Sequence, residues 1–185
     1  MQVLVYRNEE QVAKAAAMIF VSEIAAKKNA VLGLATGSTP VPTYQRLIRY
    51  NKDGLLDFTH VRTYNLDEYV GLDPNHPESY RYFMNAQLFD HINIDKTNTH
   101  VPSGLGDVER NAEAYDAAIE DAGGIDLQLL GIGHNGHIGF NEPNARSFIY
   151  KTNVVTLTAS TIEANARNFT SADDVPRQAI SLGIG

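Results

Sequence analysis

The sequence has no cysteine among its 185 residues. This absence excludes disulfide bonds, thiolate metal sites and a cysteine nucleophile. Basic residues are also fewer than acidic ones, 15 Lys and Arg against 22 Asp and Glu, and the formal net charge is −7. Proteins that bind nucleic acid normally present a basic face, so the charge balance argues against a nucleic-acid partner.

Long hydrophobic runs are missing too. No stretch reaches the roughly 18 apolar residues that predict a membrane span. The first residues, MQVLVYRNEE, carry charge too early for the apolar region of a signal peptide. We therefore expect a cytoplasmic protein without a membrane partner. Hydrophobic residues make up 43% and charged residues 20% of the chain, which is typical of a globular protein.

Strand and helix patterns alternate along the chain. Short apolar or β-branched runs predict strands at residues 2–6, 30–35, 60–66, 125–131 and 154–158. Helical patterns cover about residues 9–28, 41–51, 77–90, 107–121 and 160–168. The alternation predicts an α/β fold, with a mainly parallel central sheet flanked by helices on both faces. The chain ends in the apolar run ISLGIG without a polar tail, so we expect residues 1–185 to form a single domain truncated at its C-terminus.

In open α/β sheets, ligands bind where the carboxyl ends of strands lead into loops. One such loop is Thr36-Gly37-Ser38-Thr39, between a buried strand and a helix. Glycine lets the backbone approach an anion, the helix N-terminus offers free N–H groups, and the hydroxyls add donors. The loop is not a Walker motif, because no Gly-Lys-Ser/Thr follows. The sequence leaves two readings open, a phosphate site and a tight turn that caps the helix.

A second loop carries the acidic pair Asp67-Glu68 after a strand. Adjacent side chains in a strand point in different directions. Only one carboxylate is therefore expected to face a pocket, and the other is free for solvent or a structural hydrogen bond. Taken alone, the pair is also typical of an ordinary loop or helix cap.

The third loop, GIGHNGHIGFNEP at residues 131–143, has four glycines within nine residues. His137 and Glu142 are candidates for a proton relay, because histidine titrates near neutral pH and a carboxylate can orient it. His134 and His137 could suggest a metal pair, but no third ligand with suitable spacing accompanies them, so we expect no metal. The aromatic residues Tyr80, Tyr82, Phe83 and Phe89 have near-helical spacing and predict core packing rather than a stacking platform.

The segments LGLATGSTP, NLDEYVGL, SYRYFMN and GIGHNGHIGFNEP closely resemble the glucosamine-6-phosphate deaminase (isomerase) family, and TIEANARNF and DVPRQAISLGIG resemble its later region. GHIGFNEP is highly specific, whereas TGSTP is shared with 6-phosphogluconolactonases. The resemblance covers the chain from about its first residue to its end. It implies a Rossmann-like fold and cofactor-free conversion of glucosamine 6-phosphate and water to fructose 6-phosphate and ammonia. We accordingly expect an enzyme of the hydrolase class in amino-sugar catabolism, whose partner is a small-molecule substrate.

The resemblance also implies roles for individual residues. Asp67 would be the base that moves a proton between neighbouring carbons, an enolamine being the intermediate. His137, paired with Glu142, would open the sugar ring. Asn135 stands where many family members carry aspartate; it can orient His137 by a hydrogen bond but cannot offset imidazolium charge. The loop of Thr36, Gly37, Ser38 and Thr39, together with Arg167, would hold the phosphate.

Two alternatives remain beside this interpretation. One is a 6-phosphogluconolactonase-like hydrolase, which would need no base acting on carbon and which Phe140-Asn141-Glu142 argues against. The other is a catalytically silent sugar-phosphate sensor, which would keep the phosphate loop and lose the acid/base residues. Family members continue past this chain's end with another strand and a phosphate-contacting lysine. The oligomeric state is left open by the sequence, with a monomer favoured.

Overall fold

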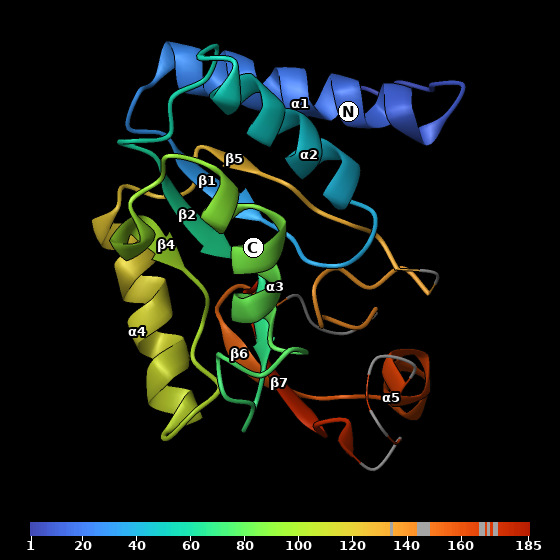
Figure 1. The fold of residues 1–185 in the computed structure, drawn as a ribbon. Helices are drawn as coiled ribbons and strands as arrows, with labels where there is room; N and C mark the ends of the chain where they lie inside the picture. The colour runs from blue at the N-terminus through green and yellow to red at the C-terminus, as the bar shows by residue number, and fades with distance from the viewer. Residues whose placement is uncertain (134, 144–148, 167–168, 170, 172–173) are drawn as a thin grey trace.

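The computed structural model describes residues 1–133, 135–143, 149–166, 169, 171 and 174–185. Its core is a four-stranded parallel sheet in the order β4-β2-β1-β5. The strands are β1 (Val31–Leu34), β2 (Arg62–Asn65), β4 (Thr99–His100) and β5 (Leu127–Gln128). The helices between them return the chain to the same edge of the sheet, as parallel pairing requires. The expected α/β fold with a parallel central sheet is confirmed (Figure 1).

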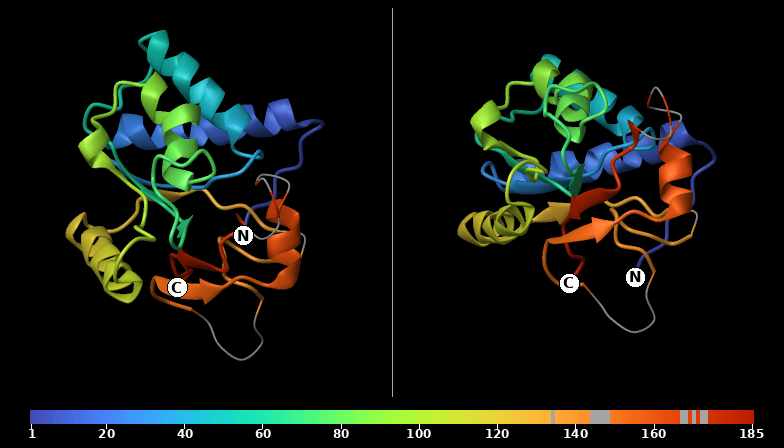
Figure 2. Two further views of the ribbon diagram at one scale, coloured as in Figure 1. Left: turned by 60° about the horizontal axis from the view of Figure 1, so that its bottom comes forward. Right: turned by 90° about the horizontal axis from the view of Figure 1, so that it is seen from below.

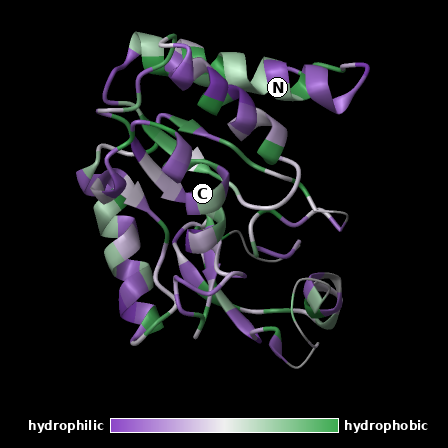
Figure 3. Cartoon of the chain, in the orientation of Figure 1, coloured by the Kyte–Doolittle hydropathy of each residue, from purple (hydrophilic) through white to green (hydrophobic). Residues whose placement is uncertain are grey.

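Helices cover both faces of this sheet. On one face, α1 (Glu9–Ala26), α2 (Val41–Lys52) and α3 (Tyr80–Gln87) pack over Leu32 and Leu34 of β1. On the other, α4 (Val108–Asp121) packs against Val31 and Tyr64. Alternate residues of β1 thus face opposite layers, which explains its unbroken apolar run. Hydrophobic and hydrophilic residues both occur along α1 and α4, as expected of helices with one buried side (Figure 3).

A second, smaller sheet is antiparallel and has the order β3-β7-β6. Its strands are β3 (Asp67–Tyr69), β6 (Asn153–Thr156) and β7 (Gln178–Ser181), and α5 (Ala159–Ala166) follows β6. In Figure 1 this sheet and α5 lie at the opposite end of the molecule from α1 and α2, and Figure 2 shows β6 and β7 side by side. The chain passes from the first sheet to the second at Leu66, whose N–H donates to Leu34 O and whose carbonyl accepts from Leu182 N.

The strand predicted for the first segment is not found. Residues 2–6 form no strand, and Val3 and Val5 are exposed, because no described strand lies beside them to pair with their backbone. The apolar run at the other end begins with Ile180 and Ser181, the last two residues of β7, which is the central strand of the second sheet. The described part of the chain includes no helix long and apolar enough to cross a membrane.

Candidate active site

The carboxyl ends of β1, β2 and β5 open into one pocket of about 890 Å³. After β1 the chain continues to β2 and β4 on one side, and it later places β5 on the other side of β1. Ligands bind at such a switch in strand order, because the loops on either side of it diverge and leave a crevice. All three loops singled out in the sequence line this pocket, and with them the residues Thr36, Gly37, Ser38, Thr39, Asp67, Asn135 and His137.

The loop after β1 keeps its hydrogen-bond donors unpaired. Throughout the described structure, the backbone N–H groups and hydroxyls of residues 36–39 make no hydrogen bond. Pro40 is the N-cap of α2, with no side-chain hydrogen bond to the helix, so the hydroxyls do not serve as caps. Gly37 has φ 99°, a conformation that L side chains rarely adopt. Free donors at a helix N-terminus form a site for an anion.

Tyr44 of α2 holds this loop at its base. Its side chain is fully buried, and its hydroxyl donates to Ala35 O at 2.5 Å. The hydroxyl oxygen of Tyr44 also accepts from Ala35 N at 3.2 Å. Ala35 is the last residue before the unpaired donors, so the loop leaves the sheet from an anchored position.

The two adjacent carboxylates have different environments. Glu68 is buried and accepts hydrogen bonds from the backbone N–H groups of Tyr69, Tyr80 and Arg81, so it holds the start of α3. Asp67 is 6% exposed and faces the pocket, and within the described structure it accepts no hydrogen bond. Burial, and to a lesser degree the charge of Glu68, raises the pKa of Asp67 to about 7. The sequence predicted one pocket-facing carboxylate; the structure places Asp67 there.

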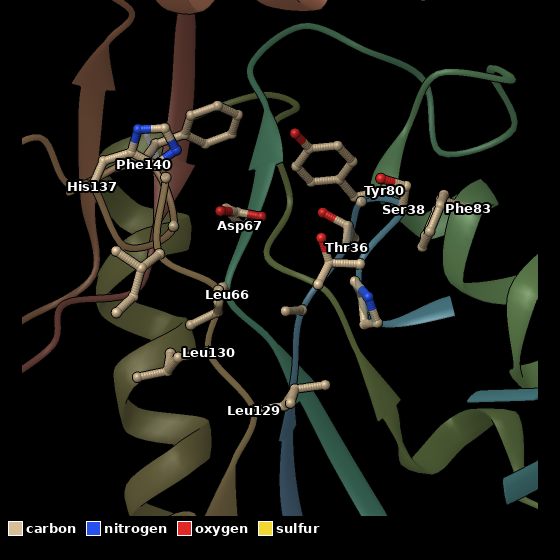
Figure 4. A pocket seen from close by; sticks show the side chains of 18 of the residues that line it. Thr36, Ser38, Leu66, Asp67, Tyr80, Phe83, Leu129, Leu130, His137 and Phe140 are labelled. Atoms are coloured by element: carbon tan, nitrogen blue, oxygen red, sulfur yellow. The ribbon is translucent and has the colours of Figure 1, made fainter. Parts of the chain in front are cut away.

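Asp67 lies between the other two loops (Figure 4). His137 and Phe140 lie on one side of its carboxylate, and Thr36, Ser38 and Tyr80 lie on the other (Figure 4). The backbone of the third loop comes close to the carboxylate at Gly139, where φ is 60° and an added Cβ would lie 3.2 Å from Asp67 Oδ2. A ligand in this pocket could therefore contact the free donors of the first loop, the Asp67 carboxylate and the His137 imidazole at once.

The third loop forms a hydrogen-bonded chain that ends at His137. His137 Nδ1 lies 2.6 Å from Asn135 Oδ1, and Asn135 Nδ2 donates to Glu142 Oε2 at 2.5 Å. The expected direct pairing of His137 with Glu142 is thus replaced by an indirect one, because the Asn135 amide occupies the space between them. The imidazole lies over Gly133, where an added Cβ would be 2.2 Å from the ring, so glycine is needed there.

Asn141 and Ser181 attach this loop to the second sheet. Ser181 Oγ of β7 accepts from Phe140 N at 3.1 Å, and Asn141 Nδ2 donates to Leu182 O at 2.8 Å. Because β7 also pairs with β3, which begins at Asp67, the loop and the carboxylate share one support. Asn141 is therefore structural, whereas Glu142 belongs to the series of hydrogen bonds that reaches His137.

The remaining predictions concern Arg167, a metal pair of histidines and the aromatic residues at positions 80–89. Arg167 and His134 lie outside the described residues. In the part of the chain that the structure describes, no three His, Asp or Glu side chains gather as a metal site. The prediction of core packing for the aromatic residues is right for Phe89, which is buried, but Tyr82 is exposed. Phe83 and Tyr80 also pack against core clusters, and both line the pocket as well. Helical spacing alone could not show this second role.

Comparison with known proteins places this arrangement in context. The family described as glucosamine-6-phosphate isomerases/6-phosphogluconolactonase matches residues 7–171. A glucosamine-6-phosphate deaminase of Clostridium perfringens (strain SM101 / Type A) is 58% identical over 186 residues, which cover 100% of this chain and 76% of that protein. The solved structure of a monomeric glucosamine-6-phosphate deaminase has a TM-score of 0.93 at 44% identity, covering 100% of this chain and 76% of that one. A 6-phosphogluconolactonase from Thermotoga maritima is 18% identical, with a TM-score of 0.71 over 98% of this chain and 76% of its own, a likeness in fold alone.

Proposed function

Because the chain belongs to the glucosamine-6-phosphate isomerase/6-phosphogluconolactonase family, we infer that it is a deaminase of that family. It converts glucosamine 6-phosphate and water to fructose 6-phosphate and ammonia. The observation that carries this assignment is the position of Asp67, a buried carboxylate with a raised pKa between an anion-binding loop and a histidine.

The hydrolase class expected from the sequence is wrong. The similar proteins are named deaminases, and the family is described by its isomerases as well as its lactonases. The decisive chemistry is a proton transfer between two carbons, as in an isomerase. Water enters only afterwards, when it adds to the imine at C2 and ammonia leaves.

In this proposal, the phosphate binds to the loop of Thr36 to Thr39. Its unpaired N–H groups, its free hydroxyls and the N-terminus of α2 supply several donors to one anion. A phosphate held there would position the distant carbon atoms of the sugar near Asp67. Arg167 is proposed as a further phosphate ligand on the strength of the family resemblance.

Asp67 is the base proposed to act on carbon. It removes the proton from C2 of the open-chain sugar, which gives an enolamine, and it returns a proton to C1, which gives an imine at C2. A base works best when its pKa lies near the working pH, and a pKa of about 7 meets that condition. The missing hydrogen-bond partner for Asp67 within the described structure leaves both of its oxygens available to the substrate.

His137 is proposed to open the ring before Asp67 can act. Asn135 Nδ2 donates to the Glu142 carboxylate, so the amide oxygen of Asn135 must face His137 Nδ1. An amide oxygen can only accept, which places the ring proton on Nδ1 and leaves Nε2 as the base. Nε2 then takes the proton of the anomeric hydroxyl and gives it to the ring oxygen, so that the C1 aldehyde forms and the ring bond breaks.

A lactonase would share the fold and the phosphate loop but would need no base for a carbon-bound proton. The acid/base groups gathered in the pocket also argue against a silent sensor. The likeness to a monomeric deaminase supports a monomer as the working form. The substrate's charged phosphate keeps it from crossing a bilayer, and we propose that the enzyme acts in the cytoplasm.

The assignment is tested by carbon-bound proton exchange. Glucosamine 6-phosphate is incubated with the protein in heavy water, and the C2 proton signal and ammonia release are followed together. Asp67→Asn should abolish exchange at C2 while leaving sugar-phosphate binding largely intact. Equal exchange rates for Asp67→Asn and the unmodified protein would overturn the role of Asp67. If the unmodified protein released no ammonia, the deaminase assignment itself would be wrong.

A further inference from the structure

The hydrogen-bonded chain that ends at His137 continues beyond Glu142 into helix α5. Glu142 Oε1 accepts from Thr161 Oγ1 at 3.0 Å and lies 3.3 Å from Thr158 Oγ1, while its Oε2 accepts from Asn135. Thr158 directly precedes α5 and Thr161 lies in its first turn. Both oxygens of the carboxylate are therefore occupied, and donors on opposite sides set its orientation.

The two threonines contribute unequally. A hydroxyl has one proton to donate. Thr158 Oγ1 accepts from the backbone N–H of Thr161 at 3.3 Å. Its single proton has three possible acceptors, which are Glu142 Oε1, Ser160 Oγ and Thr161 Oγ1. Thr161 makes the shorter contact with Glu142, and its side chain also lines the active-site pocket. Thr161 is therefore the main donor to Glu142 from α5.

We propose that Thr161 is a positioning residue for the ring-opening step, with Thr158 as its support; this inference rests on the proposed function. Thr161 holds Glu142 so that its second oxygen faces Asn135 Nδ2. Asn135 Oδ1 is thereby directed to His137 Nδ1, and the lone pair of Nε2 is left for the substrate. Thr161 does not itself exchange protons with the sugar.

Loss of the Thr161 hydroxyl should affect His137 through the two side chains between them, Glu142 and Asn135. Without its donor on Oε1, Glu142 can rotate, and the amide of Asn135 is no longer restricted to one orientation. A flipped amide presents N–H to His137 Nδ1, which then must accept, so the ring proton moves to Nε2. That tautomer cannot take the proton of the anomeric hydroxyl. The structure therefore links helix α5, which borders the pocket, to the protonation pattern of the catalytic imidazole.

The test compares Thr161→Val, which keeps the shape and removes the hydroxyl, with Thr161→Ser, which restores it. The tautomer is read from the ¹⁵N NMR shifts of histidine-labelled protein, at a pH where the imidazole is neutral; the His137→Gln spectrum identifies the signals. We expect Thr161→Val to shift the proton from Nδ1 toward Nε2 and to lower kcat for glucosamine 6-phosphate about tenfold, the scale of one hydrogen bond to a charged group. Thr161→Ser should recover both.

Two further comparisons make the result specific. Thr156→Val, the same change at an exposed position of β6, should alter neither the tautomer nor kcat. An open-chain analogue, which enters after ring opening, should be converted by Thr161→Val nearly as fast as by the unmodified protein. If Thr161→Val does not fold, Thr158→Val is measured in its place and should give the same changes in smaller size.

The proposal would be overturned if the variant kept the Nδ1–H tautomer, if serine failed to restore it, or if cyclic and open-chain substrates lost rate equally. The tautomer is measured without turnover. A chain that released no ammonia from glucosamine 6-phosphate would therefore contradict the proposed function and leave the positioning role of Thr161 to be judged by the NMR spectrum alone.

Discussion

Replacing Asp67 by asparagine should make the protein more stable above neutral pH, although it removes the proposed catalytic base. The carboxyl group has an ordinary pKa of 3.8 and a pKa of about 7 in the folded protein. Between these values the folded state holds a proton that the unfolded chain has lost. The stabilising contribution of this group to the free energy of unfolding is therefore fully present below about pH 4. That contribution is lost as pH rises through 7.

The size of this loss follows from the shift. Each pKa unit corresponds to about 1.36 kcal/mol, so the full shift amounts to roughly 4 kcal/mol, an upper value because the pocket admits some water. Asparagine has nearly the same shape and carries no charge at any pH. We expect Asp67→Asn to match the unmodified protein at pH 4 and to exceed its stability by roughly 2–4 kcal/mol at pH 8.

The measurement is urea-induced unfolding, followed by circular dichroism at intervals between pH 4 and pH 8. Asp121→Asn is the matched control, because Asp121 is exposed at the last residue of α4. It should leave the pH dependence of the unmodified protein unchanged. If the stability difference between Asp67→Asn and the unmodified protein were constant across this range, Asp67 would not carry a raised pKa, and its selection as a base poised near neutral pH would lose its physical basis.

Three other changes have expected outcomes. The kcat/KM of the unmodified protein should rise with pH through about 7 as Asp67 loses its proton. Glu68→Gln should move this rise to lower pH, because the charge of Glu68 helps to raise the pKa of Asp67. A folded variant whose kcat/KM rises at the same pH would contradict the effect of Glu68 on Asp67. Tyr44→Phe removes the two hydrogen bonds to Ala35 and should lower the free energy of unfolding by about 1–3 kcal/mol while raising KM more than it lowers kcat, measured by urea unfolding and steady-state kinetics. Gly133→Ala should slow conversion of the cyclic sugar more than that of an open-chain analogue, because its methyl group would overlap the imidazole; equal slowing would point to a general loss of loop structure.

The sequence by itself determined the layer architecture and the place of the site. Short continuous apolar runs and helical patterns with a period of 3.6 are local signals. Residues 30–35 and 107–121 became β1 and α4 with boundaries shifted by a few residues. Parallel strands align their carboxyl ends, so the three polar loops could be expected at one edge of the sheet.

Only the tertiary structure decided which side chain does what. Asp67 and Glu68 are neighbours with the same charge, and they differ because one ends up facing the pocket and the other holds the start of α3. The order His137, Asn135, Glu142, Thr161 along the hydrogen-bonded chain depends on contacts between a loop and a helix, whose spacing along the sequence does not specify a distance. Local pattern sets the elements; contacts between elements set burial, and burial sets the chemistry of each ionisable group.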